Sequence, residues 1–191
     1  MKNALLLFKL LFVLAAIITG CGNQAMNEDM VARIARREAQ NILDDYKKSF
    51  APEKFGFGVP WEKDASYAQG VKVGNLIFVA GQLSHSQTKD KTWEYDTVTV
   101  GEDFETQFRQ TLENIKAVLA HYGATMDDVV FLQSFFDPDA GGKNIGNYGP
   151  TVRKLITEYF PKAQHAMTNM QVTKLFGREQ FVETNAIAVV R

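Results

Sequence analysis

The spacing of apolar residues predicts two amphipathic helices in the second half of the chain. Residues 102–122 repeat apolar side chains at intervals of three and four, which is typical of a helix with one buried face. Acidic residues crowd its first turn, where the helix dipole favours them, and Gly123 suits the position after its end. Residues 150–160 repeat the pattern over a shorter length, with Pro150 in the first turn. We therefore expect two helices that each pack one face on a core.

Runs typical of strands lie before, between and after these helices. Residues 67–73 and 75–81 are short strand-like runs, and residues 129–136 form an apolar run of buried-strand type. Residues 164–175 and 180–190 alternate around a Phe-Gly-Arg-Glu break, which predicts a closing hairpin. The order of elements predicts an α+β or mixed α/β sheet with helices on one face.

A carboxylate interrupts the last predicted strand. Glu183 lies between Phe181 and Asn185 on one face of that strand, and His165 and Met167 share a face of the preceding run. Burying a carboxylate without a partner is costly. Glu183 is therefore either a functional group or one half of an ion pair at an interface.

The first twenty residues have the pattern of a secretory signal peptide. Lys2 supplies the positive start, and the apolar run from residue 5 to 19 is interrupted by Lys9. This run is too short and too interrupted for a spanning helix, which needs about 20 apolar residues. We expect residues 1–20 to be a lipoprotein signal peptide.

The end of this segment indicates where a lipid would be attached. Ile18-Thr19-Gly20-Cys21 resembles the lipobox of bacterial lipoproteins, in which the cysteine is lipidated. Cys21 is the only cysteine, so an internal disulfide is excluded. We expect palmitate on Cys21 and a lipid-anchored protein of the cell envelope, while an uncleaved membrane anchor is the alternative. Gly22, in place of the aspartate that retains lipoproteins in the inner membrane, favours the outer membrane in a Gram-negative cell.

Residues 21–64 are expected to connect this anchor to a globular domain over 65–191. They comprise a polar tether, an amphipathic helix over 30–50 and a loop rich in Gly, Pro and aromatic residues. The helix could contact a partner or a membrane surface, but its mixed charges favour packing on its own domain. Repeated Gly and Pro argue against a helix in the loop over 51–66.

Charge and motifs exclude several kinds of chemistry. The formal net charge is -1, so no basic field attracts nucleic acid. His85, His121 and His165 lie in different predicted elements without metal-ligand spacing, so we expect no metal site. The chain has no Gly-x-Ser-x-Gly elbow, Walker loop or GxGxxG turn.

One long stretch resembles a known family. Residues 67–82 read YAQGVKVGNLIFVAGQ, which is similar to the opening of the RidA/YjgF family of imine deaminases. The resemblance spans residues 66–191 in the family's order. It continues through TQFRQTLENIKAVLAHYG (106–123), DDVV (127–130), YFP (159–161) and residues 171–188.

The resemblance implies both a fold and a reaction. The family has a chorismate-mutase-like mixed sheet with two helices packed on one face, and three subunits form a homotrimer with ligand clefts between neighbours. Active members hydrolyse reactive 2-imino or enamino acids to 2-keto acids and use no cofactor. An arginine on the penultimate strand binds the substrate carboxylate, and a glutamate on the last strand positions or activates water.

Four positions carry the family's residues. Glu183 stands at the position of the water-positioning glutamate and is the expected catalytic residue. Tyr67 stands at the position of the cleft tyrosine, although a core role is the alternative. Gly81 and Gln82 match the family's Gly-Gln pair and are expected to line the cleft.

Other positions of the cleft depart from the family. Ala80 replaces the usual serine, and Met167 replaces the carboxylate-binding arginine. Arg153 aligns with a helix asparagine of the family. His165 shares the face of Met167 and could donate a hydrogen bond, although a single histidine in a strand is more often structural.

The missing arginine changes the expected ligand. A bidentate guanidinium–carboxylate contact is worth about 1.5–3 kcal/mol, and methionine offers neither charge nor donor. We therefore do not expect the standard 2-imino acid activity. The interpretation is a RidA-like envelope lipoprotein that binds a small, neutral or cationic metabolite and hydrolyses an imine or enamine through Glu183. A non-catalytic binding or scaffold module is the alternative, and RNA cleavage is disfavoured by the charge.

Overall fold

The computed structural model describes residues 28–85, 101, 103–140, 147–162, 164–176 and 179–190. The predicted signal peptide and the lipobox cysteine Cys21 lie outside these residues. The chain divides into two compact units, one ending at Ala51 and one running from Pro52 to Arg191.

The first unit contains one long helix, α2 (Glu28–Ser49), which confirms the helix expected over 30–50. Arg33 and Asp29 form an ion pair of 2.9 Å one turn apart, and Lys47 and Lys48 lie in the last turn, where the helix dipole favours cations. Among the helices that the structure describes, none is long and apolar enough to cross a membrane. That α2 packs on its own domain stays a prediction, as does the alternative that it contacts a partner or a membrane surface.

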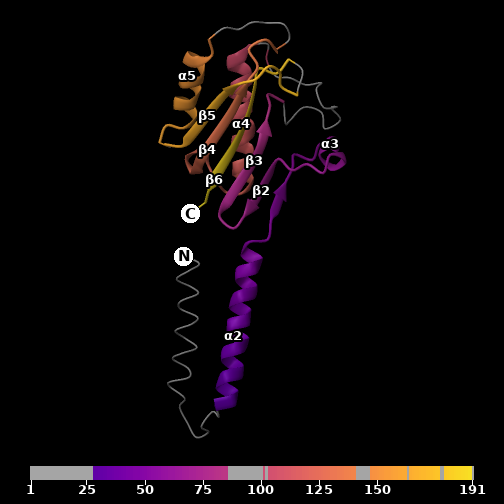
Figure 1. The fold of residues 1–191 in the computed structure, drawn as a ribbon, viewed down its shortest axis with the longest axis vertical. Helices are drawn as coiled ribbons and strands as arrows, with labels where there is room; N and C mark the ends of the chain where they lie inside the picture. Colours follow the sequence, from indigo (N-terminus) through magenta and orange to yellow (C-terminus); the bar gives the residue numbers. More distant parts are fainter. Residues whose placement is uncertain are drawn as a thin grey trace. The chain divides into compact units, whose positions relative to one another are not determined.

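The second unit is built on a six-stranded mixed sheet with the order β1-β2-β3-β6-β4-β5 (Figure 1). Among the strands that the structure describes, β4 and β5 pair in parallel and the other neighbours are antiparallel. The strands are β1 (Glu53–Phe55), β2 (Gly70–Val73), β3 (Leu76–Gln82), β4 (Val129–Phe136), β5 (Ala166–Gln171) and β6 (Val182–Val189). This arrangement confirms the expected α+β class.

The predicted closing hairpin is wrong. Strands β5 and β6 both pair with β4, which lies between them. Residues 172–181 therefore connect two strands that are not neighbours, instead of forming a tight turn. An alternating pattern predicts a strand but does not say which strand pairs with it, so the polar break resembled a hairpin turn.

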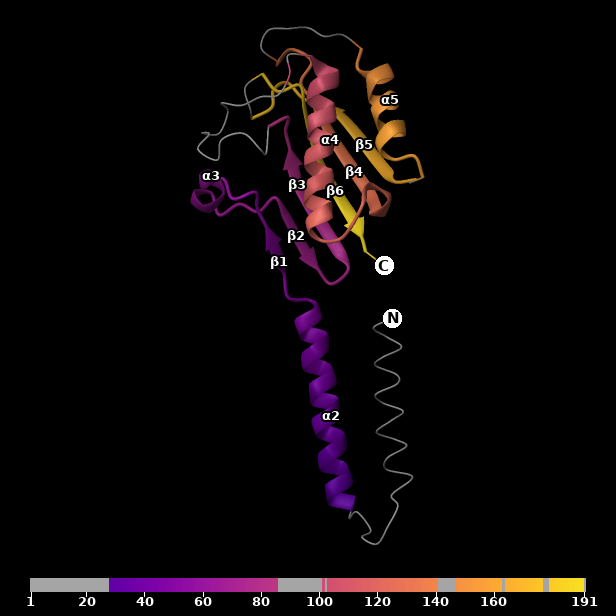
Figure 2. The same cartoon turned by 180° about the vertical axis from the view of Figure 1, so that it is seen from behind.

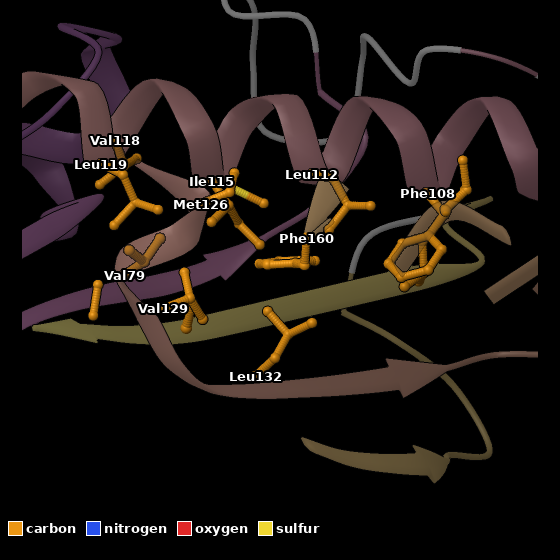
Figure 3. Close-up of a cluster of buried hydrophobic side chains, with 14 of the residues drawn as sticks. Val79, Phe108, Leu112, Ile115, Val118, Leu119, Met126, Val129, Leu132 and Phe160 are labelled. Carbon is orange, nitrogen blue, oxygen red and sulfur yellow. The ribbon is translucent and has the colours of Figure 1, made fainter. Parts of the chain in front are cut away.

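Helices α4 (Phe104–His121) and α5 (Gly149–Tyr159) pack on the same core. Figure 2 shows the side of the sheet that carries α4, with α5 next to it. The apolar residues of α4 point toward the strands, where they meet Val79, Val129 and Leu132 (Figure 3). Asp103 caps α4 by accepting from the Thr106 backbone N–H at 3.0 Å. The apolar periodicity thus identified both helices and the face that each buries.

The segment expected to be a loop over 51–66 contains two elements. Strand β1 extends the sheet beside β2, and the Tyr122 hydroxyl donates to the Glu53 carbonyl at 3.0 Å and the Gly70 carbonyl at 2.8 Å. The five residues Pro60–Asp64 form the short helix α3 with Pro60 in its first turn, although the Gly and Pro content argued against a helix. The compact unit therefore begins before Ala65.

Candidate functional site

A cavity of about 650 Å³ brings together four of the predicted site residues. Tyr67, Gly81, Gln82 and Glu183 all line it. They come from the segment before β2, the end of β3 and the start of β6, so the cavity lies where these strands meet the segment that contains α3. The sheet topology therefore assembles one site from distant parts of the chain.

A bulge in β3 shapes this site. Val79 pairs with Ala186 and Gln82 pairs with Thr184, so β3 contains one more residue than β6 across this interval. On the other side of β3, the Ala80 backbone N–H donates to the Gln69 carbonyl at 2.9 Å, which extends the β2–β3 pairing by one residue. A Cβ added at Gly81 would overlap the Glu183 carboxylate, so position 81 needs glycine for this close approach.

Glu183 contributes a carboxylate to the cavity. It lies on the half-exposed face of β6, and no hydrogen bond or ion pair joins its carboxylate to another described residue. Burial raises the pKa of Glu183 above its usual value. A half-buried carboxyl group with a raised pKa is suited to donate a proton and take it back.

Tyr67 and Gln82 contribute to the site in different ways. The Tyr67 hydroxyl donates to the Gly81 carbonyl at 3.3 Å, which holds the ring at the wall of the cavity. The buried Gln82 amide donates to Gln69 Oε1 at 2.8 Å and to the Ala80 carbonyl at 3.2 Å. Gln82 therefore maintains the bulge, so its amide donor is already used.

A buried carboxylate organises the segment that covers the site. Glu62 accepts from the backbone N–H groups of Phe57 and Gly58, both at 2.9 Å, and from Gln69 Nε2 at 2.8 Å. The Cβ of any larger residue at Gly56 would approach Glu62 Oε2 to 2.6 Å. Glu62 thus connects the segment that contains Phe57 and Gly58 to Gln69, the residue before β2.

Polar side chains of α4 hold the segments that follow β3 and precede β6. Asn114 Nδ2 donates to the Leu83 and His85 carbonyls, both at 2.9 Å. Gln107 accepts from the Phe181 N–H at 2.8 Å, just before β6 begins. Sequence reasoning treated this helix face as purely apolar and missed these residues, which share the face of its apolar stripe.

The cavity also contains groups that the sequence did not single out as site residues. Trp61, Asp64, His85 and Phe176 line it. The aromatic residues interleaved with Gly and Pro before β2 were a signal for a structured wall. Asp64 and Phe176 had no signal, because nothing in the sequence places them near Glu183.

Met167 and Arg153 lie elsewhere on the chain. Both line a second hollow, of about 670 Å³, between α5 and β5. Met167 pairs with Leu132 and Glu183 pairs with Phe135, so they flank β4 three residues apart along it. At about 3.3 Å per residue and about 4.8 Å between strands, their Cα atoms are about 14 Å apart. One chain therefore does not bring position 167 to Glu183.

The remaining predicted residues line neither space. The His165 ring packs on Phe160 with centroids 4.5 Å apart, and burial lowers the pKa of His165. Ala80 contributes its backbone to the bulge, as described above, and is not a wall of the cavity. In the described part of the chain, no three His, Cys, Asp or Glu residues gather in a way that could hold a metal ion.

Comparison with known proteins identifies relatives over most of the second unit. Residues 61–190 match the family model described as Endoribonuclease L-PSP. The chain is 32% identical to a RutC family protein of Pyrococcus abyssi over 122 residues, which are 64% of this chain and 84% of the relative. It is 31% identical to the 3-aminoacrylate deaminase RutC of Acinetobacter baylyi over 126 residues, which are 66% of this chain and 88% of the relative.

A solved structure shares the fold. The crystal structure of a YjgF/YER057c/UK114 family member from Mycobacterium tuberculosis is 25% identical and superposes with a TM-score of 0.58, covering 73% of this chain and all of that one. The sequence match and the shared fold cover the same compact unit. The chain therefore belongs to the Endoribonuclease L-PSP family, the family of the RidA, RutC and YjgF proteins.

Proposed function

We propose that the cavity hydrolyses the C=N bond of a small neutral or cationic imine or enamine, with Glu183 as the acid and base. The observation that carries this proposal is the Glu183 carboxylate, half-buried in the cavity and joined to no other described residue. An isolated carboxylate in such a place is costly to the fold, and its raised pKa suits proton transfer.

The chemistry requires no group beyond water. Protonated Glu183 donates to the imine nitrogen, which makes the carbon more electrophilic. The resulting carboxylate accepts a proton from the water that adds to this carbon, giving a carbinolamine. Glu183 then returns that proton to the nitrogen, and the C–N bond breaks as ammonia or an amine leaves. The hydroxyl proton of the carbinolamine passes to the Glu183 carboxylate as the carbonyl forms, which restores the protonated acid.

The relatives support this reaction class. The Acinetobacter baylyi relative is a 3-aminoacrylate deaminase, an enzyme acting on an enamine-type nitrogen. No Lys or Arg is among the described residues that line the cavity, which supports a neutral or cationic ligand in place of an anionic 2-imino acid. The same lining weighs against RNA cleavage, because phosphate contacts need cations.

We also propose that the working site is a cleft between subunits of a homotrimer. The sheet face away from α4 carries apolar side chains that are partly exposed in the single chain, including Phe78 (43%) and Val130 (45%). Such a face is typical of an interface. Because Met167 and Glu183 lie far apart in one chain, position 167 could reach Glu183 only from a neighbouring chain.

The test compares two substrates made in the assay. One is 2-aminoacrylate, which is anionic, and the other is benzaldimine formed from benzylamine by an amine oxidase. We expect ammonia release from benzaldimine to accelerate with the wild-type protein, and little acceleration with 2-aminoacrylate. Glu183→Gln should abolish the acceleration while the protein remains folded. Equal turnover by wild type and Glu183→Gln would contradict the proposal.

The cellular location is a separate proposal. The signal-like residues 1–20 and the lipobox ending at Cys21 support a protein anchored by lipid to the cell envelope, with the outer membrane favoured in a Gram-negative cell. Metabolic labelling with palmitate tests it, since Cys21→Ala should lose the label. Unchanged labelling of this variant would rule the proposal out.

A further inference from the structure

We infer that the Glu183 cavity selects an organic cation, a protonated amine or iminium, through two carboxylates and a wall of aromatic rings. This inference rests on the proposed function, because it names the ligand class of the same site. It is carried by the charges, the hydrogen-bond capacity and the ring faces of the cavity.

The charges that line the cavity have one sign. Asp64, at the end of α3, and Glu183, on β6, both line it, and no Lys or Arg does so among the described residues. No ion pair or hydrogen bond joins either side chain to another described residue, whereas the carboxylates of Glu105 and Glu113 are both ion-paired on the surface. A cation placed between Asp64 and Glu183 would be attracted to both.

The neutral amides of the wall have little left to offer a ligand as donors. Asn114 Nδ2 donates to two backbone carbonyls, and Gln69 Nε2 donates to Glu62. Gln82 Nε2 donates to Gln69 and to its own strand. Of the amides and carboxylates in the wall, the carboxylates are therefore the groups with capacity to spare, and they only accept. A ligand that brings its own N–H donors fits this arrangement.

Aromatic rings form much of the remaining wall. The Trp61 and Tyr67 rings lie with centroids 5.1 Å apart and planes tilted by 49°, and Phe57 also lines the cavity. Phe176 contributes a ring that is 80% exposed, so it lies at the mouth. Ring faces attract ammonium groups and repel carboxylates, and tryptophan is the most effective of them. The rings and the acids thus favour the same ligand charge.

Three probes of similar shape test the inference by calorimetry at neutral pH. Benzylammonium carries a positive charge, benzyl alcohol is neutral and benzoate is negative. We expect benzylammonium to bind about tenfold more tightly than benzyl alcohol, and benzoate to bind most weakly.

Two variants connect this preference to the carboxylates. Glu183→Gln and Asp64→Asn should each weaken benzylammonium binding about three- to tenfold and leave benzyl alcohol binding unchanged, which also shows that the cavity is still folded. Asp127→Asn, which removes the charge of an exposed residue of the η1 turn (Met126–Asp128) outside the cavity, should change neither affinity. Benzoate binding as tightly as benzylammonium, no binding of any probe, or a preference that survives both variants would overturn the inference.

The binding result and the turnover result separate the two proposals. If benzylammonium is preferred but benzaldimine is not hydrolysed, the cation site stands and the catalytic proposal fails. If benzaldimine is hydrolysed through Glu183 while the three probes bind alike, the catalytic proposal stands and the cation inference fails.

Discussion

The carboxylate of Glu183 occupies the space where any residue other than glycine at position 81 would place its Cβ. The bulge in β3 brings the two residues into this contact across the β3–β6 pair. Glycine at 81 therefore allows the Glu183 side chain of β6 to lie directly against the backbone of β3.

Gly81→Ala should separate activity from stability. The added methyl must displace the Glu183 side chain, whose carboxylate is its flexible end, so we expect unfolding free energy to change by less than about 1 kcal/mol. Imine hydrolysis should fall about 100-fold, since the acid leaves its position. Wild-type activity in Gly81→Ala, or a loss of more than about 2 kcal/mol of unfolding free energy, would show that glycine at 81 does not act by placing the Glu183 carboxylate.

The buried carboxyl group should make stability depend on pH in a defined direction. Burial raises the pKa of Glu183 in the folded chain, so the folded state holds this proton more tightly than the unfolded state does. The contribution of Glu183 to stability is then complete below the unfolded pKa and is lost as pH rises through the folded pKa. We expect Glu183→Gln to be more stable than wild type at pH 7 in urea titrations. This gain should disappear below about pH 4, and an equal gain at both pH values would contradict the assignment.

Glu62 should behave as a structural carboxylate, in contrast to Glu183. It is buried and accepts three hydrogen bonds, from Phe57, Gly58 and Gln69. Glu62→Gln puts an NH₂ group where one of these donors points, so we expect a loss of about 2–4 kcal/mol of unfolding free energy. The exposed Glu53→Gln is the matched control and should lie within about 0.5 kcal/mol of wild type. Similar unfolding midpoints in urea for the two variants would show that the network contributes little.

The helices and strands of the second unit were predictable because their periods are local. The apolar stripe of α4 and the apolar run of β4 each reflect which residues of that single element are buried, so each could be recognised from a short stretch of sequence. The partner of β5 was not predictable, because pairing depends on contacts far along the chain. Strand β1 and helix α3 were not predicted, because the Gly and Pro residues around them are typical of a loop. Both elements are also short: β1 forms three residue pairs with β2, and α3 has five residues.

The site was predictable in part. The family resemblance led to Tyr67, Gly81, Gln82 and Glu183, which the fold does bring to one cavity. The same resemblance pointed to Met167, which lines a different hollow, because a pattern shared by a family of oligomers does not say which chain supplies each residue. Asp64 lies before residues 66–191, over which the sequence resembles the family, so only the fold places it in the cavity.

Met167→Arg should restore the family's carboxylate contact if a neighbouring chain completes the cleft. The guanidinium would bind the carboxylate of 2-aminoacrylate and contribute about 1.5–3 kcal/mol, so we expect kcat/KM for this substrate to rise about 10- to 100-fold. Met167→Gln, of similar size and without charge, should give no such rise. Efficient wild-type turnover of 2-aminoacrylate would refute the importance of the missing arginine. A folded, trimeric Met167→Arg protein without any gain would instead show that position 167 does not face Glu183 of a neighbour.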